Sequence, residues 1–300
     1  MTDTGAVLLR QVQVAGRTVD VRTRHERVEV IGSSLAPEAG DVVVEGSGGA
    51  LIPGLHDHHI HLFATAAAAS SVVVGPPEVR DVAELERVLH DAHARLAPGA
   101  WIRAVGYHES VAGDLDRQAL DRMVARRPVR VQHRSGARWI LNTAAITSAG
   151  LPGRDHPGIE RDHAGAPTGR VDRADDWLRS LLPAAAAPDL APLGATLAAF
   201  GVTGLTDTTP SERIGDLDAL AAAVASGAVP QRVVVTGGRG LAGVDAPDGV
   251  ALGPVKLIVD DGAYPSLDDI AGDIATAHGH GRAVAIHCVT RAALVLALAA

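Results

Sequence analysis

The chain has 300 residues, a net charge of −8 and 47% hydrophobic residues. This balance is that of one large globular domain or two modest ones, and it excludes collagen-like and disordered classes. The mild acidity argues against a nucleic-acid partner, and no apolar run reaches the roughly 18 residues of a membrane span. Cys288 is the one cysteine and no signal peptide is evident, so we expect a cytoplasmic protein. A homo-oligomer is allowed but not required.

Residues 6–52 predict a small β module. Short runs rich in Val and Ile alternate with Gly and Pro turns, as in AVLLRQVQV and DVVVEGSGG. No helical periodicity interrupts them, so we expect strands and no helix.

Helical periodicity begins further along the chain. Residues 81–97 predict a helix, because Asp81 and Glu84 have capping-box spacing and a leucine-rich stripe follows them. Similar patterns predict helices over 211–226 and from Ser266 to about His278. These helices separate apolar runs of strand length.

Five apolar runs predict strands that alternate with these helices, at about 50–57, 201–209, 231–237, 255–261 and 283–289. Continuous Val/Ile runs between helices indicate an α/β fold with a parallel sheet covered on both faces. The segment of about 62–195 is too long for one crossover, so we interpret it as a large insertion after the first of these strands.

A histidine cluster ends the first of these strands, in PGLHDHHIHL. Because strand side chains alternate between faces, Asp57, His59 and His61 should point one way and His56 and His58 the other. Two imidazoles two residues apart on a rigid strand can bind one metal ion, so we predict His59 and His61 as ligands. A solvated pair of histidines is the alternative.

Lys256 is the single lysine beside 26 arginines. It lies in the apolar strand VKLIVDD, and a primary amine can lose a proton and add CO₂ to give an anionic oxygen ligand, which a guanidinium cannot do. The alternative is a salt bridge to Asp207 or Asp260. We favour amine chemistry, because arginine serves everywhere else for charge.

Other candidates lie near strand ends. His287 ends the run AVAIHCV, where α/β barrels place their chemistry. His108 and His133 end apolar runs in the insertion and are expected to line a pocket. The GRGLAG run at 238–243 fits a dinucleotide fingerprint, but residues 243–254 hold two prolines and cannot open the required helix, so we expect a loop over the barrel mouth.

Taken together, these motifs resemble the metal-dependent amidohydrolase superfamily, and within it the amidohydrolase-3 (YtcJ-like) family. The resemblance covers the whole chain and rests on PGLHDHHIHL, WIRAVGYHE, PVRVQHRSGARWILNTAAI, GAPTGRV, FGVTGLTD, VKLIVDDG and AVAIHCVTRAAL. It implies a TIM-type (β/α)8 barrel at 51–300, with the insertion at about 62–195, and an N-terminal β-sandwich part at 1–50. About five of the eight barrel strands are present, so we expect a C-terminally truncated chain with a further His and Asp beyond Ala300.

The resemblance also implies roles for individual residues. His59 and His61 match the first metal ligands, Lys256 the carboxylated lysine that bridges two metals, and His287 a ligand of the second metal. Asp57 would position the ligands without binding the metal itself. The implied substrate-pocket residues are His108, His133, Trp139 and Asn142, and no other cofactor is expected.

The implied activity is hydrolysis of an amide, imide or N-acyl/formyl-type C–N bond of a small molecule. Metal-activated water would attack the carbon, with one or two divalent ions, which we expect to be zinc. One alternative is a mononuclear deaminase that uses the same histidines without carboxylated Lys256. The other is a non-catalytic metal-binding or scaffold protein, if the chain ends at residue 300.

Overall fold

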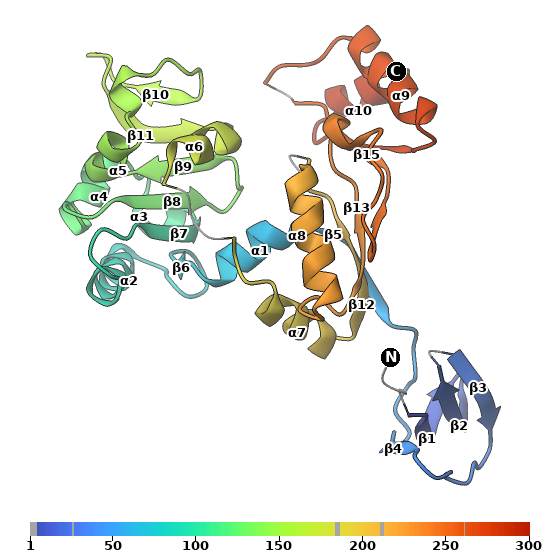
Figure 1. The fold of residues 1–300 in the computed structure, drawn as a ribbon. Coiled ribbons are helices and arrows are strands. Elements are labelled where there is room, and N and C mark those ends of the chain that lie inside the picture. Colours follow the sequence, from blue (N-terminus) through green and yellow to red (C-terminus); the bar gives the residue numbers. More distant parts are fainter. Residues whose placement is uncertain (1–4, 26, 184–186, 211–212, 261) are drawn as a thin grey trace. The chain divides into compact units, whose positions relative to one another are not determined.

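The computed structural model describes residues 5–25, 27–183, 187–210, 213–260 and 262–300. The chain divides into two compact units, Met1–Leu55 and His56–Ala300. The division lies five residues after the predicted boundary at residue 50. Figure 1 shows the first unit in dark blue and the second from light blue to red.

The first unit is one four-stranded sheet of order β3-β2-β1-β4. Its strands are β1 (Val7–Val14), β2 (Arg17–Arg24), β3 (Arg27–Gly32) and β4 (Val42–Glu45). β1 and β4 run parallel and the other pairs antiparallel. The described residues of this unit contain no helix, which confirms the prediction for the β module.

A buried carboxylate organises this sheet. Asp20 on β2 is fully buried and accepts hydrogen bonds from the backbone N–H of Gln11 (2.8 Å) and of Leu35 (2.9 Å). Gln11 has the left-handed backbone angle φ +52°. These two hydrogen bonds, aided by the charge of Arg10, hold the pKa of Asp20 below its usual value although burial opposes them.

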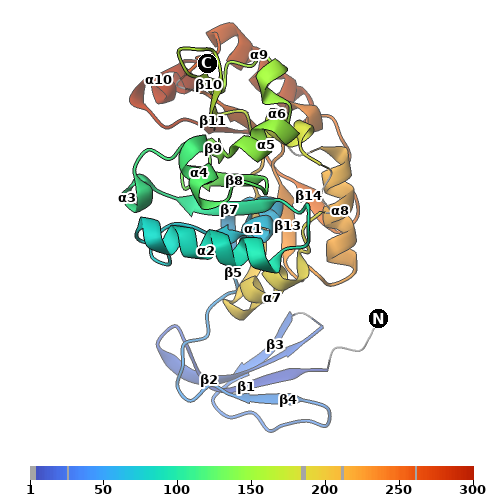
Figure 2. The same ribbon diagram turned by 90° about the vertical axis from the view of Figure 1, so that its left-hand side faces the viewer.

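The insertion builds a sheet of its own, with six strands in the order β10-β11-β9-β8-β7-β6. The strands are β6 (Val72–Val73), β7 (Ile102–Tyr107), β8 (Val129–His133), β9 (Arg138–Leu141), β10 (Ile159–Arg161) and β11 (Pro167–Asp172). The helices are α1 (Leu62–Ala69), α2 (Val82–Arg95), α3 (Glu109–Ala112), α4 (Arg117–Met123), α5 (Thr143–Ser148), α6 (Asp175–Leu181) and the 3-10 turn η1 (Leu151–Gly153). β6, β7 and β8 run parallel. Figure 2 shows α2 running beside β7.

Helix α2 begins as the sequence predicts. The Asp81 carboxylate accepts the N–H of Glu84 (2.9 Å), while the Glu84 carboxylate accepts the N–H of Arg80 (2.7 Å). Leu85 and Leu89 of its apolar stripe are fully buried in a core shared with β7 and β8.

The remaining elements form the predicted parallel α/β arrangement. They are β5 (Leu55–Ile60), α7 (Ala191–Ala199), β12 (Val202–Asp207), α8 (Ile214–Ala225), β13 (Arg232–Val235), η2 (Arg239–Leu241), β14 (Val250–Leu252), β15 (Val255–Ile258), α9 (Leu267–Gly279), β16 (Val284–His287) and α10 (Arg291–Ala299). The sheet orders are β14-β13-β12-β5 and β15-β16. β12, β13 and β14 are parallel, as are β15 and β16. None of the helices among the described residues is long and apolar enough to cross a membrane.

The structure corrects two details of this part. Residues 250–252, expected in a loop, form strand β14 on the edge of β13. The first strand starts at Leu55 and extends to Ile60, beyond the expected end at residue 57, because the hydrogen bond from Thr208 N to Ile60 O extends its pairing with the segment after β12. The absence of a dinucleotide-binding helix after residue 238 is confirmed, since only the three-residue turn η2 follows. Positions 211, 212 and 261 of the predicted elements lie outside the described residues.

Candidate active site

The histidine cluster at the end of β5 separates into two pairs, in agreement with strand alternation. The rings of His59 and His61 meet edge to face with centroids 5.4 Å apart. Those of His56 and His58 are 4.4 Å apart. His56 Nε2 is hydrogen-bonded to Thr206 Oγ1 of β12 at 2.8 Å. His56 is therefore engaged with β12, whereas His59 and His61 form a separate ring pair.

Asp207, at the end of β12, organises the backbone around this pair. It is fully buried, and its two carboxylate oxygens accept the N–H groups of Leu62 and Thr209, both at 2.8 Å. Thr209 Oγ1 lies 3.0 Å from His61 Nδ1. When His61 Nδ1 is held by the threonine, Nε2 is left for another partner.

The third and fourth predicted residues lie on neighbouring parallel strands. In the register of β15 and β16, Lys256 is opposite Ala285 and His287 is opposite Ile258. Lys256 is half-buried, and burial lowers the pKa of its amine. His287 is exposed.

Electrostatics link these side chains to the β5 pair. Burial lowers the pKa of His61, and the charges of His59, Lys256 and His287 lower it further, while Asp207 opposes them. All three predicted partners therefore lie near enough to act on His61.

The salt-bridge alternative for Lys256 is not seen. The Asp207 carboxylate is occupied by backbone N–H groups, and the Asp260 carboxylate pairs with Arg173. Within the described ranges of the chain, Lys256 makes no ion pair. Its amine is left available for other chemistry.

The donor set fits a divalent ion in kind but is not gathered into a closed site. Imidazoles and an anionic oxygen are ligands that zinc accepts. Among the side chains that the structure describes, however, no group of three or more His, Cys, Asp or Glu is close enough to hold a metal ion. Asp57 Oδ1 accepts the N–H of His59 at 2.9 Å, so this carboxylate holds the backbone just before the ring pair.

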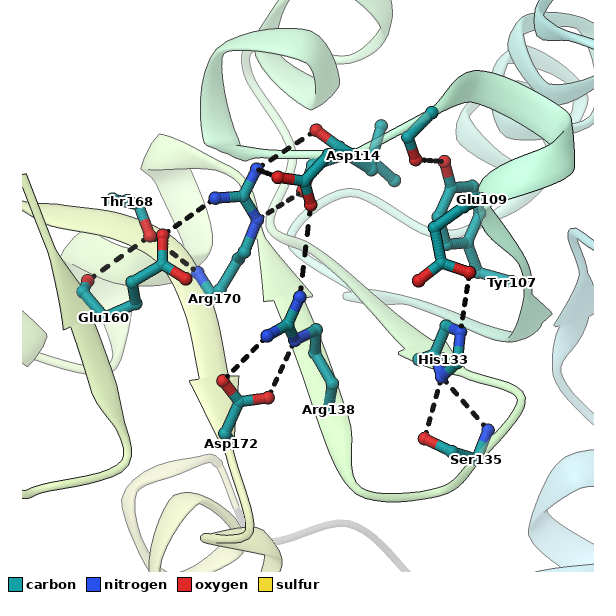
Figure 3. A network of polar contacts seen from close by, with 12 residues as sticks. Tyr107, Glu109, Asp114, His133, Ser135, Arg138, Glu160, Thr168, Arg170 and Asp172 are labelled. Carbon is teal, nitrogen blue, oxygen red and sulfur yellow. Dashed lines mark hydrogen bonds and ion pairs between the residues drawn. The ribbon is translucent and has the colours of Figure 1, made fainter.

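The insertion brings two more predicted residues together. His133, at the end of β8, contacts Ser135 Oγ through Nδ1 (2.7 Å) and Glu109 Oε2 through Nε2 (3.2 Å) (Figure 3). His108 repeats this arrangement, with Nδ1 at 2.9 Å from Ser110 Oγ and Nε2 at 3.8 Å from the same Glu109 oxygen. Hydrogen bonds from its own backbone and from His133 keep the pKa of Glu109 low.

An open cavity of about 470 Å³ lies beside this cluster. Its lining residues are Glu109, His133, Ser135, Ala137, Arg138, Asp172 and Arg173. Figure 3 shows the Arg138–Asp172 pair on the neighbouring strands β9 and β11. Arg173 links this cavity to the loop after β15 through its ion pair with Asp260.

Trp139 and Asn142 have structural positions. Asn142 is fully buried, accepts the N–H groups of Val129 and Ala145, and donates to the carbonyls of Val124 and Arg127. Trp139 is 3% exposed. Their role as pocket residues stays a prediction.

Sequence reasoning missed Asp207 and Thr209 as parts of this site. The signal was present in FGVTGLTDTT, where an acid and two threonines end an apolar strand. At the carboxyl end of a parallel strand, such residues lie where α/β folds place their chemistry.

The chain is similar to known proteins in sequence and in fold. Residues 42–300 match the family model described as "Amidohydrolase family". Over 177 residues, 52% of this chain, the sequence is 29% identical to an N-substituted formamide deformylase from Arthrobacter pascens. That match spans 32% of the deformylase, so the chain aligns with about a third of this curated relative.

Two solved structures share the fold. An uncharacterized metal-dependent hydrolase from Pyrococcus horikoshii superposes with a TM-score of 0.71 at 16% identity, covering 98% of this chain and 67% of that one. A second from Pyrococcus furiosus gives 0.69 at 19% identity, covering 98% and 69%.

Proposed function

Because the chain belongs to the amidohydrolase family, we propose that it hydrolyses a C–N bond of a small molecule with one or two divalent metal ions. The observation that carries the proposal is Lys256, an amine without an ion pair among the described residues, whose charge acts on His61 together with those of His59 and His287. A half-buried amine with a lowered pKa can add CO₂ and release a proton, which gives a carbamate oxygen ligand.

The chain's own residues divide the work of the site. His59, His61 and His287 would offer imidazole nitrogens, and carboxylated Lys256 an anionic oxygen. Thr209 orients the His61 ring, and Asp207 fixes the backbone that carries both. A bound divalent ion, zinc in our proposal, would polarise the substrate carbonyl and increase the acidity of water.

The substrate we propose is an N-substituted formamide or a related N-acyl compound. The support is the similarity to the Arthrobacter pascens protein, whose name describes removal of a formyl group. The cavity beside His133 and Arg138 would receive the part of the substrate remote from the reacting carbon.

The test compares two histidines of the same strand. In the full-length protein, His59→Ala should lower the bound zinc measured by mass spectrometry and reduce formate release from a series of N-substituted formamides by about 100-fold or more. His58→Ala, on the opposite face of the strand from His59, is the matched control and should leave both quantities unchanged. Unchanged metal content and activity in His59→Ala would overturn the proposal.

A variant of Lys256 distinguishes a two-metal site with a carboxylated lysine from a site that holds one metal ion. Lys256→Arg keeps the charge but cannot form a carbamate. We expect this variant to bind less metal, and we expect the unsubstituted protein, stripped of metal, to reload it only when bicarbonate is present. Reloading that does not depend on bicarbonate would contradict the carboxylated lysine.

A further inference from the structure

Two arginines lie directly opposite each other on the sheet of the insertion. Arg103 of β7 pairs in register with Arg130 of β8. Their strand neighbours Ile102, Ala104 and Val129 are fully buried in the core on the other face. Like charges in direct cross-strand positions destabilise a sheet, so this pair requires an explanation.

An aromatic ring joins the two guanidinium groups. Arg103 lies 5.6 Å and Arg130 4.8 Å from the ring centroid of Trp139, on the adjacent strand β9. The Trp139 indole N–H donates to Asp175 at 2.7 Å. The ring therefore fixes the two cations side by side.

The two arginines differ in their partners. Arg103 donates to the carbonyl of Ala67 at 2.9 Å and to the hydroxyl of Ser71. Across the described segments, Arg130 has neither a hydrogen bond nor an ion pair. The buried side-chain atoms found without a hydrogen bond are Arg10 Nε, Asp41 Oδ1 and Gln231 Oε1. The unpaired nitrogens of the half-buried Arg130 are therefore open to solvent.

The environment disfavours the charge of Arg130. Burial and the neighbouring Arg103 lower its pKa to about 10, so it remains a cation at neutral pH at a cost in stability. A half-buried guanidinium whose free donors reach solvent can bind a planar anion through two parallel hydrogen bonds.

We propose that Arg130 and Arg103, held on the face of Trp139, form a binding site for a small-molecule monocarboxylate. The charge balance selects a single negative charge. Arg103, Arg130 and Arg179 together bring +3, and Asp175 and Asp176, which pair with Arg179 at 2.6 and 3.5 Å, bring −2, so one positive charge is left over. The site thus takes a carboxylate in preference to a phosphate dianion.

A purely structural stack makes the opposite prediction for stability. If the cation–π contact only holds the sheet together, removing Arg130 lowers the stability of the free protein. If the arginines form an anion-binding site, removing Arg130 relieves its repulsion with Arg103. The stability of the free protein then rises, as is common when a binding residue is removed.

The experiment follows thermal unfolding of the full-length protein with increasing sodium benzoate, against sodium chloride at equal ionic strength. Benzoate at 20 mM should raise the midpoint by about 3 to 6 °C for a millimolar site. Arg130→Met should unfold at a higher midpoint without benzoate and lose the benzoate response. Sodium phosphate at equal ionic strength should have a smaller effect than benzoate.

Arg87→Met is the matched control, because Arg87 is an exposed arginine of α2 paired with Asp91. It should keep the full benzoate response. The proposal is overturned if benzoate acts no more strongly than chloride, if phosphate stabilises as strongly as benzoate, or if Arg130→Met retains the response. A lower midpoint of Arg130→Met without benzoate would likewise overturn it in favour of a structural stack.

Discussion

Asp207 shows how much one side chain can organise. Among the residues that the structure describes it forms no ion pair, yet both carboxylate oxygens accept backbone N–H groups, one from Leu62, directly after His61, and one from Thr209. The two halves of the site, β5 and the segment after β12, are thereby fixed to each other although about 145 residues separate them.

We expect Asp207→Ala to be strongly destabilising. The substitution leaves two backbone donors without partners, each costing about 1 to 3 kcal/mol when buried. The free energy of unfolding, measured by guanidinium denaturation with circular dichroism, should fall by about 2 to 4 kcal/mol. Asp218→Ala, an exposed aspartate on α8, should change it by less than about 0.5 kcal/mol. Equal effects of the two substitutions would refute this role.

At the scale of elements, the insertion depends on one close approach. Gly75 follows the short strand β6 and packs against β7, where a Cβ added to it would lie 1.7 Å from the carbonyl oxygen of Gly106. No side chain fits there, because the opposing atom is backbone.

Alanine substitutions at Gly75 and at Gly272 should therefore change the free energy of unfolding in opposite directions. Gly75→Ala must displace β6 from β7 and should cost at least about 2 kcal/mol. Gly272 lies exposed within α9 with nothing near its Cβ position, so Gly272→Ala should gain up to about 1 kcal/mol from helix propensity. Denaturation midpoints of the two variants check both signs. A neutral Gly75→Ala would show that the segment after β6 does not pack closely against Gly106.

At the scale of the whole molecule, the chain comprises two units with different sources of stability. The insertion and the parallel strands have extensive aliphatic cores, whereas the N-terminal sheet has a small one around Val12, Val19 and Val21. Within that sheet, the Asp20 carboxylate contributes through hydrogen bonds to Gln11 and Leu35.

This makes the N-terminal unit sensitive to acid. The pKa of Asp20 is lowered on folding, so its contribution is present above the unfolded value of about 3.9 and is lost as the pH falls through the folded value. Asp20→Asn should reduce the protection of β1 amides from hydrogen exchange at pH 7. It should also make that protection depend less on pH.

Hydrogen exchange by mass spectrometry, corrected for intrinsic rates, is the suitable measurement. All three tryptophans lie beyond residue 100 and do not report on this unit. Glu45→Gln, on an exposed strand, serves as the control and should preserve the acid-induced loss. An unaltered pH profile in Asp20→Asn would exclude the proposed role.

Several strands and one helix cap could be predicted from the local sequence pattern. The strand runs at 201–209, 231–237, 255–261 and 283–289 all contain strands, and each is shorter than predicted because pairing ends before the apolar pattern does. Strand β14 was not predictable, since VAL at 250–252 is too short to stand out and forms only on the edge of β13. The cap of α2 depends on neighbouring residues alone and was predicted.

The sequence by itself determined the residue types and strands of the candidate site, because alternation along a strand and the choice of lysine over arginine are local properties. It determined the pairing of His59 with His61 for the same reason. Only the tertiary structure decided which side chains act on His61, that Asp207 serves backbone N–H groups, and that Arg103 and Arg130 face each other. These facts depend on the register between strands far apart in the chain, which residue spacing does not encode.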